Sequence, residues 1–224
     1  MKIKAAIFDM DGTLVDSLSF WGLFWSDLGK KYLGVEGFVP DPETDRSVRT
    51  MIMSETAPYI RNYYNINESD ESFFEYVLSY LNNFYKEKAK EKAGATPLLE
   101  YLRGEGVKIC LASASEMSGI KIATNATGLA KHFDLVLSCA DVGAGKDKPD
   151  VYLKAAELLG CNPEEICVFE DSFVALETAR GAGFLTVGVY DKFNYGQDRL
   201  KNASDIYLSK GERLDSVIGR ITAK

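Results

Sequence analysis

The sequence most strongly constrains the fold near its amino terminus, where an apolar run ends abruptly in two carboxylates. Residues 3–17 read IKAAIFDMDGTLVDS, and the apolar residues before Asp9 are typical of a buried parallel strand. Side chains two apart on an extended segment point the same way, so Asp9 and Asp11 can face one small volume while Gly12 lets the chain turn. Two like charges at this range repel unless a cation or a proton separates them. The pattern favours a metal site, a nucleophile beside an acid/base, or both, over an Asp-Gly turn with solvated aspartates.

The composition is that of a globular protein with a sizeable core. Of 224 residues, 46% are hydrophobic and 26% charged, and the net charge is -7. No Lys/Arg cluster is broad enough for a nucleic-acid backbone, so we expect no nucleic-acid partner. The start MKIKAAIF is too short an apolar run for a signal peptide, and no apolar run of about 18 residues follows. We therefore expect a cytoplasmic protein without a membrane partner.

Cysteine and histidine show no catalytic or metal-binding spacing. The four cysteines form no C-x-x-C or Cys/His pattern, and Cys110 and Cys167 lie in apolar, strand-like runs that predict buried side chains. The single histidine, His132, has no recognisable Ser or Cys partner. Carboxylates must therefore carry any proton transfer.

A helical segment follows the first strand. Residues 18–91 show apolar and aromatic side chains at helical spacing and contain both tryptophans, with no evident strand. We expect an all-helical cap domain at residues 17–91, inserted into a core domain made of residues 1–16 and 92–224. Helices are predicted within the cap at residues 20–28, 46–53, 58–64 and 68–90.

Beyond the cap, strands and helices alternate, which is the pattern of a parallel α/β sheet. Six polar residues of the types used in catalysis or ligand binding follow the carboxyl ends of separate strands, or lie in the loops just beyond them. In an open α/β sheet that edge is where ligands bind, and an accidental scatter would use both edges. Strands are predicted at residues 107–112, 133–138, 166–169, 185–189 and 206–208. The polar residues are Asp9, Asp11, Ser113, Lys146, Glu170 and Asp171.

The four segments that carry these residues resemble the haloacid dehalogenase superfamily of aspartate-nucleophile phosphotransferases. They read DMDGT, LASAS, GKDKPD and FEDS, in the family's order and at family-like spacing, so the resemblance covers the whole chain. The chain is similar to the branch with a helical cap after the first strand, where sugar phosphomutases and small-molecule phosphatases occur. The resemblance implies an α/β fold with a Rossmann-like parallel-sheet core and a mobile lid.

The resemblance also implies catalytic roles. Asp9 resembles the nucleophile that takes the phosphoryl group as an aspartyl phosphate, and Asp11 resembles the general acid/base. Ser113, with the amide of Ala114, matches the hydroxyl that holds the phosphate. Lys146 matches the lysine that pairs with the phosphoryl group and the nucleophile.

A magnesium site is part of the same resemblance. Glu170 and Asp171 match the acidic pair that holds the ion, together with Asp9 and the backbone carbonyl of Asp11. Hard oxygen ligands, without a usable His or a Cys cluster, point to Mg²⁺ rather than zinc.

Each motif also has a purely structural interpretation. Ser113 alone could cap the following helix. Glu170 and Asp171 could be a charge pair at a helix N terminus. Asp147 stands where the family commonly has proline, so either Lys146 or Lys148 could be the lysine of this motif.

Substrate selection is expected to involve both lobes. We expect Gly12, Thr13 and Ala114 from the core motifs, and Trp21 and Arg49 from the cap, to contact the substrate. The alternative for the cap residues is packing of aromatic rings in the cap core and solvent exposure of arginines. Trp25 and Arg46 are further candidates with the same alternative.

The function predicted is a Mg²⁺-dependent phosphomonoester hydrolase that acts on a small phosphorylated metabolite, such as a sugar phosphate. In the β-phosphoglucomutase branch the position resembling Trp21 usually carries a histidine, so its absence disfavours a mutase, which stays open as the alternative. A non-catalytic binding protein on the same fold is a third hypothesis, disfavoured by the intact set of acidic residues. The acidic surface and small cap fit a monomer.

Overall fold

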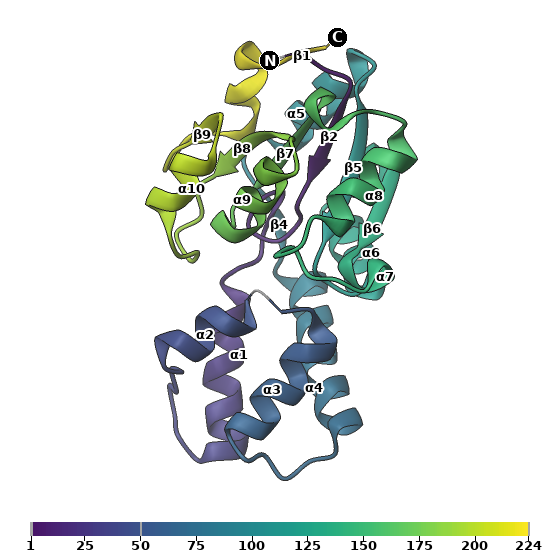
Figure 1. The fold of residues 1–224 in the computed structure, drawn as a ribbon. Helices are drawn as coiled ribbons and strands as arrows, with labels where there is room; N and C mark the ends of the chain where they lie inside the picture. Colours follow the sequence, from purple (N-terminus) through teal and green to yellow (C-terminus); the bar gives the residue numbers. More distant parts are fainter. Residues whose placement is uncertain (1, 50, 224) are drawn as a thin grey trace.

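The computed structural model describes residues 2–49 and 51–223 and shows a parallel sheet with a helical lobe beyond one edge (Figure 1). The strand order is β6-β5-β2-β7-β8-β9, and all neighbouring strands are parallel. The predicted α/β class with a Rossmann-like core is confirmed. The strands are β2 (Ala5–Phe8), β5 (Lys108–Ser113), β6 (Leu135–Ser138), β7 (Ile166–Glu170), β8 (Leu185–Val189) and β9 (Ile206–Leu208).

Helices cover both faces of the sheet, which explains why β2 is apolar without alternation. Successive side chains of a strand point to opposite faces. Ala5 and Ile7 pack with α8 and α9, whereas Ala6 and Phe8 pack with α5 and α6 on the other face. The bounds are α5 (Ala95–Gly104), α6 (Met117–Ala126), α8 (Asp150–Leu159) and α9 (Phe173–Gly181).

The remaining core elements are short. They are α7 (Cys139–Val142), α10 (Gln197–Ala203) and the 3₁₀ segments Leu129–His132, Pro163–Glu165 and Leu214–Arg220. A small parallel pair, β1 (Lys2–Ile3) with β10 (Thr222–Ala223), brings the two ends of the described chain side by side (Figure 1).

The strand order explains why β2 carries the candidate site. From β2 the chain passes to β5 and β6 on one side, then crosses to β7, β8 and β9 on the other. In an open α/β sheet, ligands bind at the carboxyl ends of the strands where the order reverses. Asp9 directly follows β2 and therefore lies at this point.

A helical lobe lies beyond the carboxyl ends of the strands (Figure 1). Its interior is aromatic: the Phe24 ring lies 5.5 Å from the rings of Phe20 and Trp25, and 5.8 Å from Tyr80, between ring centroids. None of the described helices is long and apolar enough to cross a membrane. The lobe contains α1 (Phe20–Leu28), a π-helical turn (Gly29–Leu33), α2 (Pro42–Val48), α3 (Met53–Tyr63) and α4 (Asp70–Glu87).

Helices α2 and α3 begin earlier than the predicted residues 46–53 and 58–64. Asp41 caps α2, because its Oδ1 accepts the backbone N–H groups of Glu43 (3.1 Å) and Thr44 (2.9 Å), and proline occupies the first helical position. As the N-cap residue, Asp41 thus starts the helix at the residue directly after it. Both boundaries were wrong by several residues, while the predicted helical character holds.

The expectation of no strand within residues 18–91 was wrong. The two segments that join the lobes pair with each other as an antiparallel ladder, β3 (Val15–Asp16) with β4 (Lys90–Glu91). A two-residue strand has no periodicity to detect, and its partner lies far away in the sequence. The ladder lies near the predicted boundaries, and the division into domains 17–91 and 1–16 with 92–224 stays a prediction.

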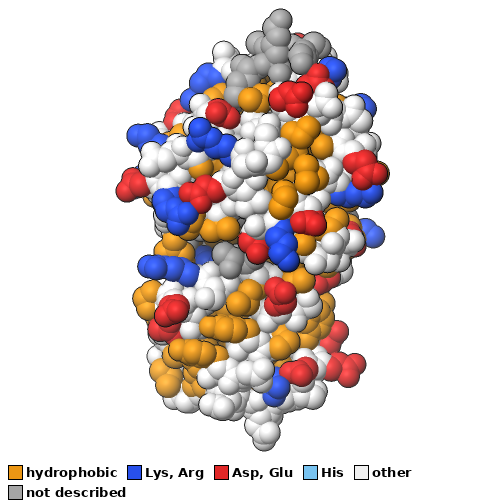
Figure 2. All heavy atoms as spheres, in the orientation of Figure 1, with side chains coloured by type: hydrophobic (Ala, Val, Ile, Leu, Met, Phe, Trp, Pro, Cys, Tyr) orange, Lys and Arg blue, Asp and Glu red, His pale blue; other side chains and the backbone are white. Residues whose placement is uncertain are grey.

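Figure 2 shows acidic and basic side chains interspersed over the face in view, and hydrophobic side chains on both lobes, over helices α1 to α4 and near α8. No broad basic patch is visible on that face.

The domain division can be tested through Phe24, which is fully buried in the cap. We expect Phe24→Ala to lower the free energy of unfolding of the cap by about 3–5 kcal/mol, because it removes a ring from a packed aromatic cluster. Hydrogen exchange should accelerate in α1 and α4 while β2 and β7 keep their protection. Leu23→Ala on the same helix is the control, since Leu23 is 40% exposed. Equal loss of protection in the sheet would contradict an independent cap.

Candidate active site

The loop after β2 is held tightly between the sheet and Asp171. The backbone N–H of Asp9 donates to the carbonyl of Phe169 (3.0 Å), and that of Gly12 donates to Val15 (2.8 Å). Gly12 has φ +91°, and a Cβ there would lie 2.2 Å from Oδ2 of Asp171. Only glycine therefore allows this approach.

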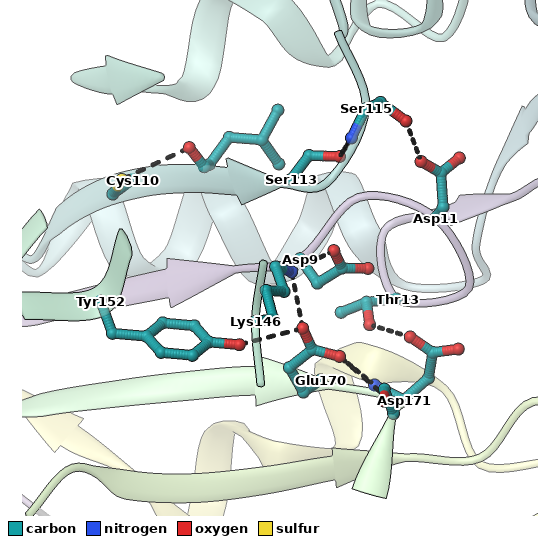
Figure 3. Close-up of polar contacts among 12 residues, drawn as sticks. Asp9, Asp11, Thr13, Cys110, Ser113, Ser115, Lys146, Tyr152, Glu170 and Asp171 are labelled. Carbon is teal, nitrogen blue, oxygen red and sulfur yellow. Dashed lines mark hydrogen bonds and ion pairs between the residues drawn. The ribbon is translucent and has the colours of Figure 1, made fainter. Parts of the chain in front are cut away.

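A buried lysine lies between two carboxylates (Figure 3). The Nζ of Lys146 donates to Oδ1 of Asp9 and to Oε1 of Glu170 (2.6 Å), and Tyr152 Oη donates to the same Glu170 oxygen (3.2 Å). The side chains of Asp9 and Glu170 are buried as well, whereas Lys148 is exposed. The geometry thus favours Lys146 over Lys148 as the lysine of the site.

Asp171 completes a group of three carboxylates. One oxygen each of Asp9, Glu170 and Asp171 lie within 4.8 Å of one another. Asp171 is itself held by Thr13, whose Oγ1 donates to Oδ1 (3.1 Å), and by Asn194, whose Nδ2 donates to Oδ2 (2.8 Å). Three buried oxygen donors at this spacing could hold a divalent cation.

Burial and mutual repulsion shift the titration of this group. Burial raises the pKa of Asp171 to about 7, and the charge of Glu170 adds to the shift. Burial also raises the pKa of Asp9, although the charge of Lys146 opposes this. Burial by itself lowers the pKa of Lys146, but the charges of Asp9 and Glu170 outweigh it and raise the pKa. The carboxylates exceed the ammonium group in number, so the site favours uptake of a proton or a cation.

Asp11 has different surroundings from Asp9. Its carboxylate accepts hydrogen bonds from Ser17 Oγ (2.6 Å), from Tyr85 Oη (2.8 and 2.9 Å) and from Ser115 Oγ (2.9 Å). Burial raises the pKa of Asp11 while these three hydroxyl groups oppose the shift. The Asp11 carboxylate is thus engaged by hydroxyl groups and is not one of the three clustered carboxylates.

The helix-cap interpretation of Ser113 does not hold. Helix α6 begins at Met117 with Glu116 at the N-cap position. The Oγ of Ser113 instead accepts the backbone N–H of Ser115 (3.1 Å), in the turn after β5. Ser113 and Ala114 both line the cavity described below.

Glu170 is both a charged residue at a helix N terminus and a member of the site. Its Oε2 accepts the backbone N–H groups of Asp171 and Ser172 (3.1 Å each), just before α9 begins. Its Oε1 accepts from Lys146 and Tyr152. The helix-terminal contact therefore fixes one carboxylate oxygen while the other belongs to the site.

A cavity of about 420 Å³ lies between the two lobes, a volume suited to a small ligand. Trp21 and Arg49 line it from the cap, as does Arg46. The Arg49 guanidinium lies 5.7 Å from the Trp21 ring centroid and pairs with Asp45 (3.0 Å). Trp25 is 2% exposed and donates to Asp45 (2.7 Å), so it is a cap-core residue, as the structural alternative expected.

Gly12 and Thr13, expected to contact substrate, do not line this cavity. Both lie against Asp171, Gly12 through its close approach and Thr13 through its hydrogen bond. Ala114, Trp21 and Arg49 do line the cavity, as stated above. A direct part in substrate binding stays a prediction for all five.

Several residues of the site escaped prediction. Tyr85 lies four residues after Leu81, on the apolar face predicted for the long cap helix, so helical spacing could have found it. Ser115 lies in the LASAS segment, two residues after Ser113. Asn194 and Tyr195 belong to a polar loop without a motif, and no local signal marks them.

The fold and site together define an α/β enzyme in which a helical lobe covers a buried lysine and an acidic group. The family model of haloacid dehalogenase-like hydrolases matches residues 3–183, and the chain belongs to this family.

Two curated relatives are phosphatases. The chain is 28% identical over 220 residues to the phosphorylated carbohydrates phosphatase of Thermotoga maritima, covering 98% of this chain and 100% of that protein. It is 27% identical over 191 residues to hexitol phosphatase A of Escherichia coli, covering 84% of each. A solved β-phosphoglucomutase of Clostridium difficile has a TM-score of 0.74 at 22% identity, covering 96% of this chain and 93% of that one, and shares the fold. The prediction of a phosphatase- or phosphomutase-type enzyme of this family is confirmed.

The raised pKa of Asp171 predicts a pH dependence for the metal-free protein. A carboxyl group whose pKa is higher in the folded than in the unfolded protein stabilises the folded state at low pH. This stabilisation is complete below the pKa of the unfolded state and is lost as the pH rises through the folded-state pKa of about 7. In excess chelator, the free energy of unfolding should therefore fall by about 1–3 kcal/mol between about pH 5 and pH 8.

Urea unfolding at several pH values measures this effect. Asp171→Asn should flatten the dependence, whereas Asp16→Asn, at an exposed position, should leave it unchanged. Stability of the wild type that rises steadily over this range would contradict the assignment.

Proposed function

We propose that the protein is a Mg²⁺-dependent phosphomonoester hydrolase that acts through an aspartyl phosphate on a small phosphorylated metabolite, such as a sugar phosphate. The observation that carries the proposal is the buried contact of Lys146 with Asp9, beside Glu170 and Asp171. Phosphoryl transfer needs in-line positioning and charge neutralisation more than covalent chemistry. The names of the two curated phosphatases, one for phosphorylated carbohydrates and one for hexitols, support this substrate class.

The donor set fits Mg²⁺. Among the described residues, the group contains three carboxylates and neither His nor Cys, and Mg²⁺ prefers such hard oxygen ligands. Asp9, Glu170 and Asp171 would hold the ion with their carboxylates, and Asp11 with its backbone carbonyl. When bound, the ion would neutralise charge on the phosphoryl oxygens.

In the first step, a carboxylate oxygen of Asp9 attacks phosphorus and the bond from phosphorus to the leaving oxygen breaks. Hydrogen bonds among the described residues engage only Oδ1 of Asp9, so Oδ2 is available as the attacking atom. Asp11, protonated, gives its proton to the leaving oxygen, and its raised pKa favours this acid form. The products are the free alcohol and a phosphorylated Asp9.

In the second step, water attacks the aspartyl phosphate. Asp11, now a carboxylate, takes a proton from the water as the new bond to phosphorus forms and the bond to Asp9 breaks. Inorganic phosphate leaves, and both aspartates return to their starting states. Ser113, the amide of Ala114 and Lys146 hold the phosphoryl oxygens throughout.

A mutase remains the alternative, with a sugar hydroxyl in the place of water. Such an enzyme must bind a substrate with a second phosphate and exclude water. The guanidinium of Arg49, which lines the cap side of the cavity, is already paired with Asp45. Its charge is therefore partly neutralised, and this favours the hydrolase.

Phosphate release tests the proposal directly. Purified protein with Mg²⁺ should release inorganic phosphate from a few members of a panel of phosphomonoesters that includes hexitol phosphates and β-glucose 1-phosphate. Asp9→Asn should reduce the release to background, because an amide is a poor nucleophile, while circular dichroism shows an intact fold. Excess chelator should stop the reaction and added Mg²⁺ should restore it.

The alternatives give different results. Conversion of β-glucose 1-phosphate to a 6-phosphate with little free phosphate would identify a mutase. Turnover by Asp9→Asn would refute the nucleophile assignment, and full activity in chelator would refute the metal.

Lys146 and Lys148 form a matched pair for a second test. Lys146→Met should lower kcat by about 100- to 1000-fold, because it removes the charge that faces Asp9 and the transferring group. Lys148→Met should leave kcat unchanged, because this side chain is exposed. The reverse result in steady-state phosphate-release assays would move the role to Lys148.

A further inference from the structure

A loop between β8 and α10, residues 190–196, connects the acidic group to the cap. Asn194 Nδ2 donates to Oδ2 of Asp171 (2.8 Å) and to its backbone carbonyl (3.0 Å). The next residue, Tyr195, donates its hydroxyl to Oδ2 of Asp45 in helix α2 of the cap. Neighbouring residues of one loop therefore hold a carboxylate of the proposed metal site and a carboxylate of the cap.

A second contact ties the same loop to the cap. The carbonyl of Phe193 accepts from Nη1 of Arg49 (3.2 Å), at the C-terminal end of α2. The Arg49 guanidinium lies 5.4 Å from the Tyr195 ring centroid. Both ends of the Asp45–Arg49 pair are thus in contact with the loop, which faces the cavity through Asn194 and Tyr195.

Asp45 joins Tyr195 to the interior of the cap. It is 6% exposed and also accepts hydrogen bonds from Trp25 Nε1 (2.7 Å) and Arg49 Nε (3.0 Å). A buried carboxylate depends on such donors, and loss of one is costly. The hydroxyl of Tyr195 is the donor that reaches Asp45 from the core lobe.

The base of the loop is held by an ion pair and hydrogen bonds. Asp191 is 3% exposed and pairs with Lys92 (2.6 Å), which directly follows the β4 strand between the lobes. Asp191 also accepts the backbone N–H of Phe193 (2.8 Å), and its carbonyl accepts from Gln197 (3.0 Å). The loop therefore has little freedom to move at one end without moving at the other.

The loop also lies directly against the segment that carries Asp171. Gly196 has φ +69°, and a Cβ there would lie 2.4 Å from Cδ1 of Phe173, the first residue of α9. A shift of the loop would thus displace Asp171 in two ways, through its hydrogen bond with Asn194 and through the packing of Gly196 on Phe173.

From these contacts we infer that Asn194 and Tyr195 are positioning residues that couple metal binding at Asp171 to the position of cap helix α2 against the core. The inference rests on the proposed function for the identity of the metal site. Asn194 orients a ligand carboxylate, and Tyr195 keeps Asn194 in place through Asp45. Coupling of this kind is reciprocal, so weakening the cap contact must weaken metal binding.

The test measures Mg²⁺ binding by isothermal titration calorimetry on the full chain without substrate. Asn194→Ala should raise the dissociation constant about tenfold or more, as expected for loss of a hydrogen bond to a ligand carboxylate. Tyr195→Phe, which removes only a hydroxyl that donates to Asp45, should raise the dissociation constant about fivefold. Each variant should remain folded in chelator at the titration temperature, although its melting temperature should fall with the lost hydrogen bond, and Asn194→Ser replaces Asn194→Ala if that variant is poorly folded.

Tyr63→Phe is the matched control. Tyr63 likewise donates its hydroxyl to an aspartate of the cap (Asp41, 3.1 Å), but it belongs to the cap itself, is 52% exposed and lies outside the loop and the cavity lining. Its variant should bind Mg²⁺ like the wild type. Wild-type affinity in Tyr195→Phe, or in the Asn194 variant, would overturn the coupling. Absence of Mg²⁺ binding by the wild type would instead refute the metal in the proposed function.

Discussion

The contact of one ammonium group with two buried carboxylates is the interaction on which the site depends. Lys146 meets Asp9 and Glu170 where Asp171 is close by, so negative charge is in excess. Removing charges from water is costly, and one lysine offsets only part of that cost. Backbone amides at Glu170, and side-chain donors at Asp171, satisfy further oxygens. The arrangement is suited to binding a cation and a phosphoryl group rather than to stabilising the fold.

The two aspartates of the first motif illustrate how surroundings divide roles. Asp9 faces an ammonium group, which only donates hydrogen bonds and therefore favours an ionised carboxylate. Asp11 faces three hydroxyl groups, from Ser17, Tyr85 and Ser115. A hydroxyl can donate to a carboxylate or accept from a carboxylic acid. The ammonium group thus opposes the rise in the pKa of Asp9 that burial causes, whereas the hydroxyl groups suit an acid/base that alternates between two states.

The core of this protein was predictable because its signals are local. Four apolar runs became strands β2, β5, β7 and β8, and strand β8 has the predicted bounds 185–189. Parallel strands bring their carboxyl ends to one edge, so the convergence of Asp9, Lys146 and Glu170 follows from the order of elements. The β3–β4 ladder, the hydroxyl of Tyr85 and the loop at Asn194 depend on pairings between distant segments. No periodicity or motif in one segment records such a pairing.

Two of the residues that escaped prediction join the lobes. Tyr85 reaches from helix α4 of the cap to the carboxylate of Asp11, and Tyr195 reaches from the core to Asp45. Both tyrosines line the cavity, and the hydroxyl of each belongs to one lobe and binds a carboxylate of the other. A hydroxyl group holds its partner only within about 3 Å and over a narrow range of angles. The position of the cap thus determines the surroundings of the proposed acid/base and, through the loop at residues 190–196, the support of the acidic group.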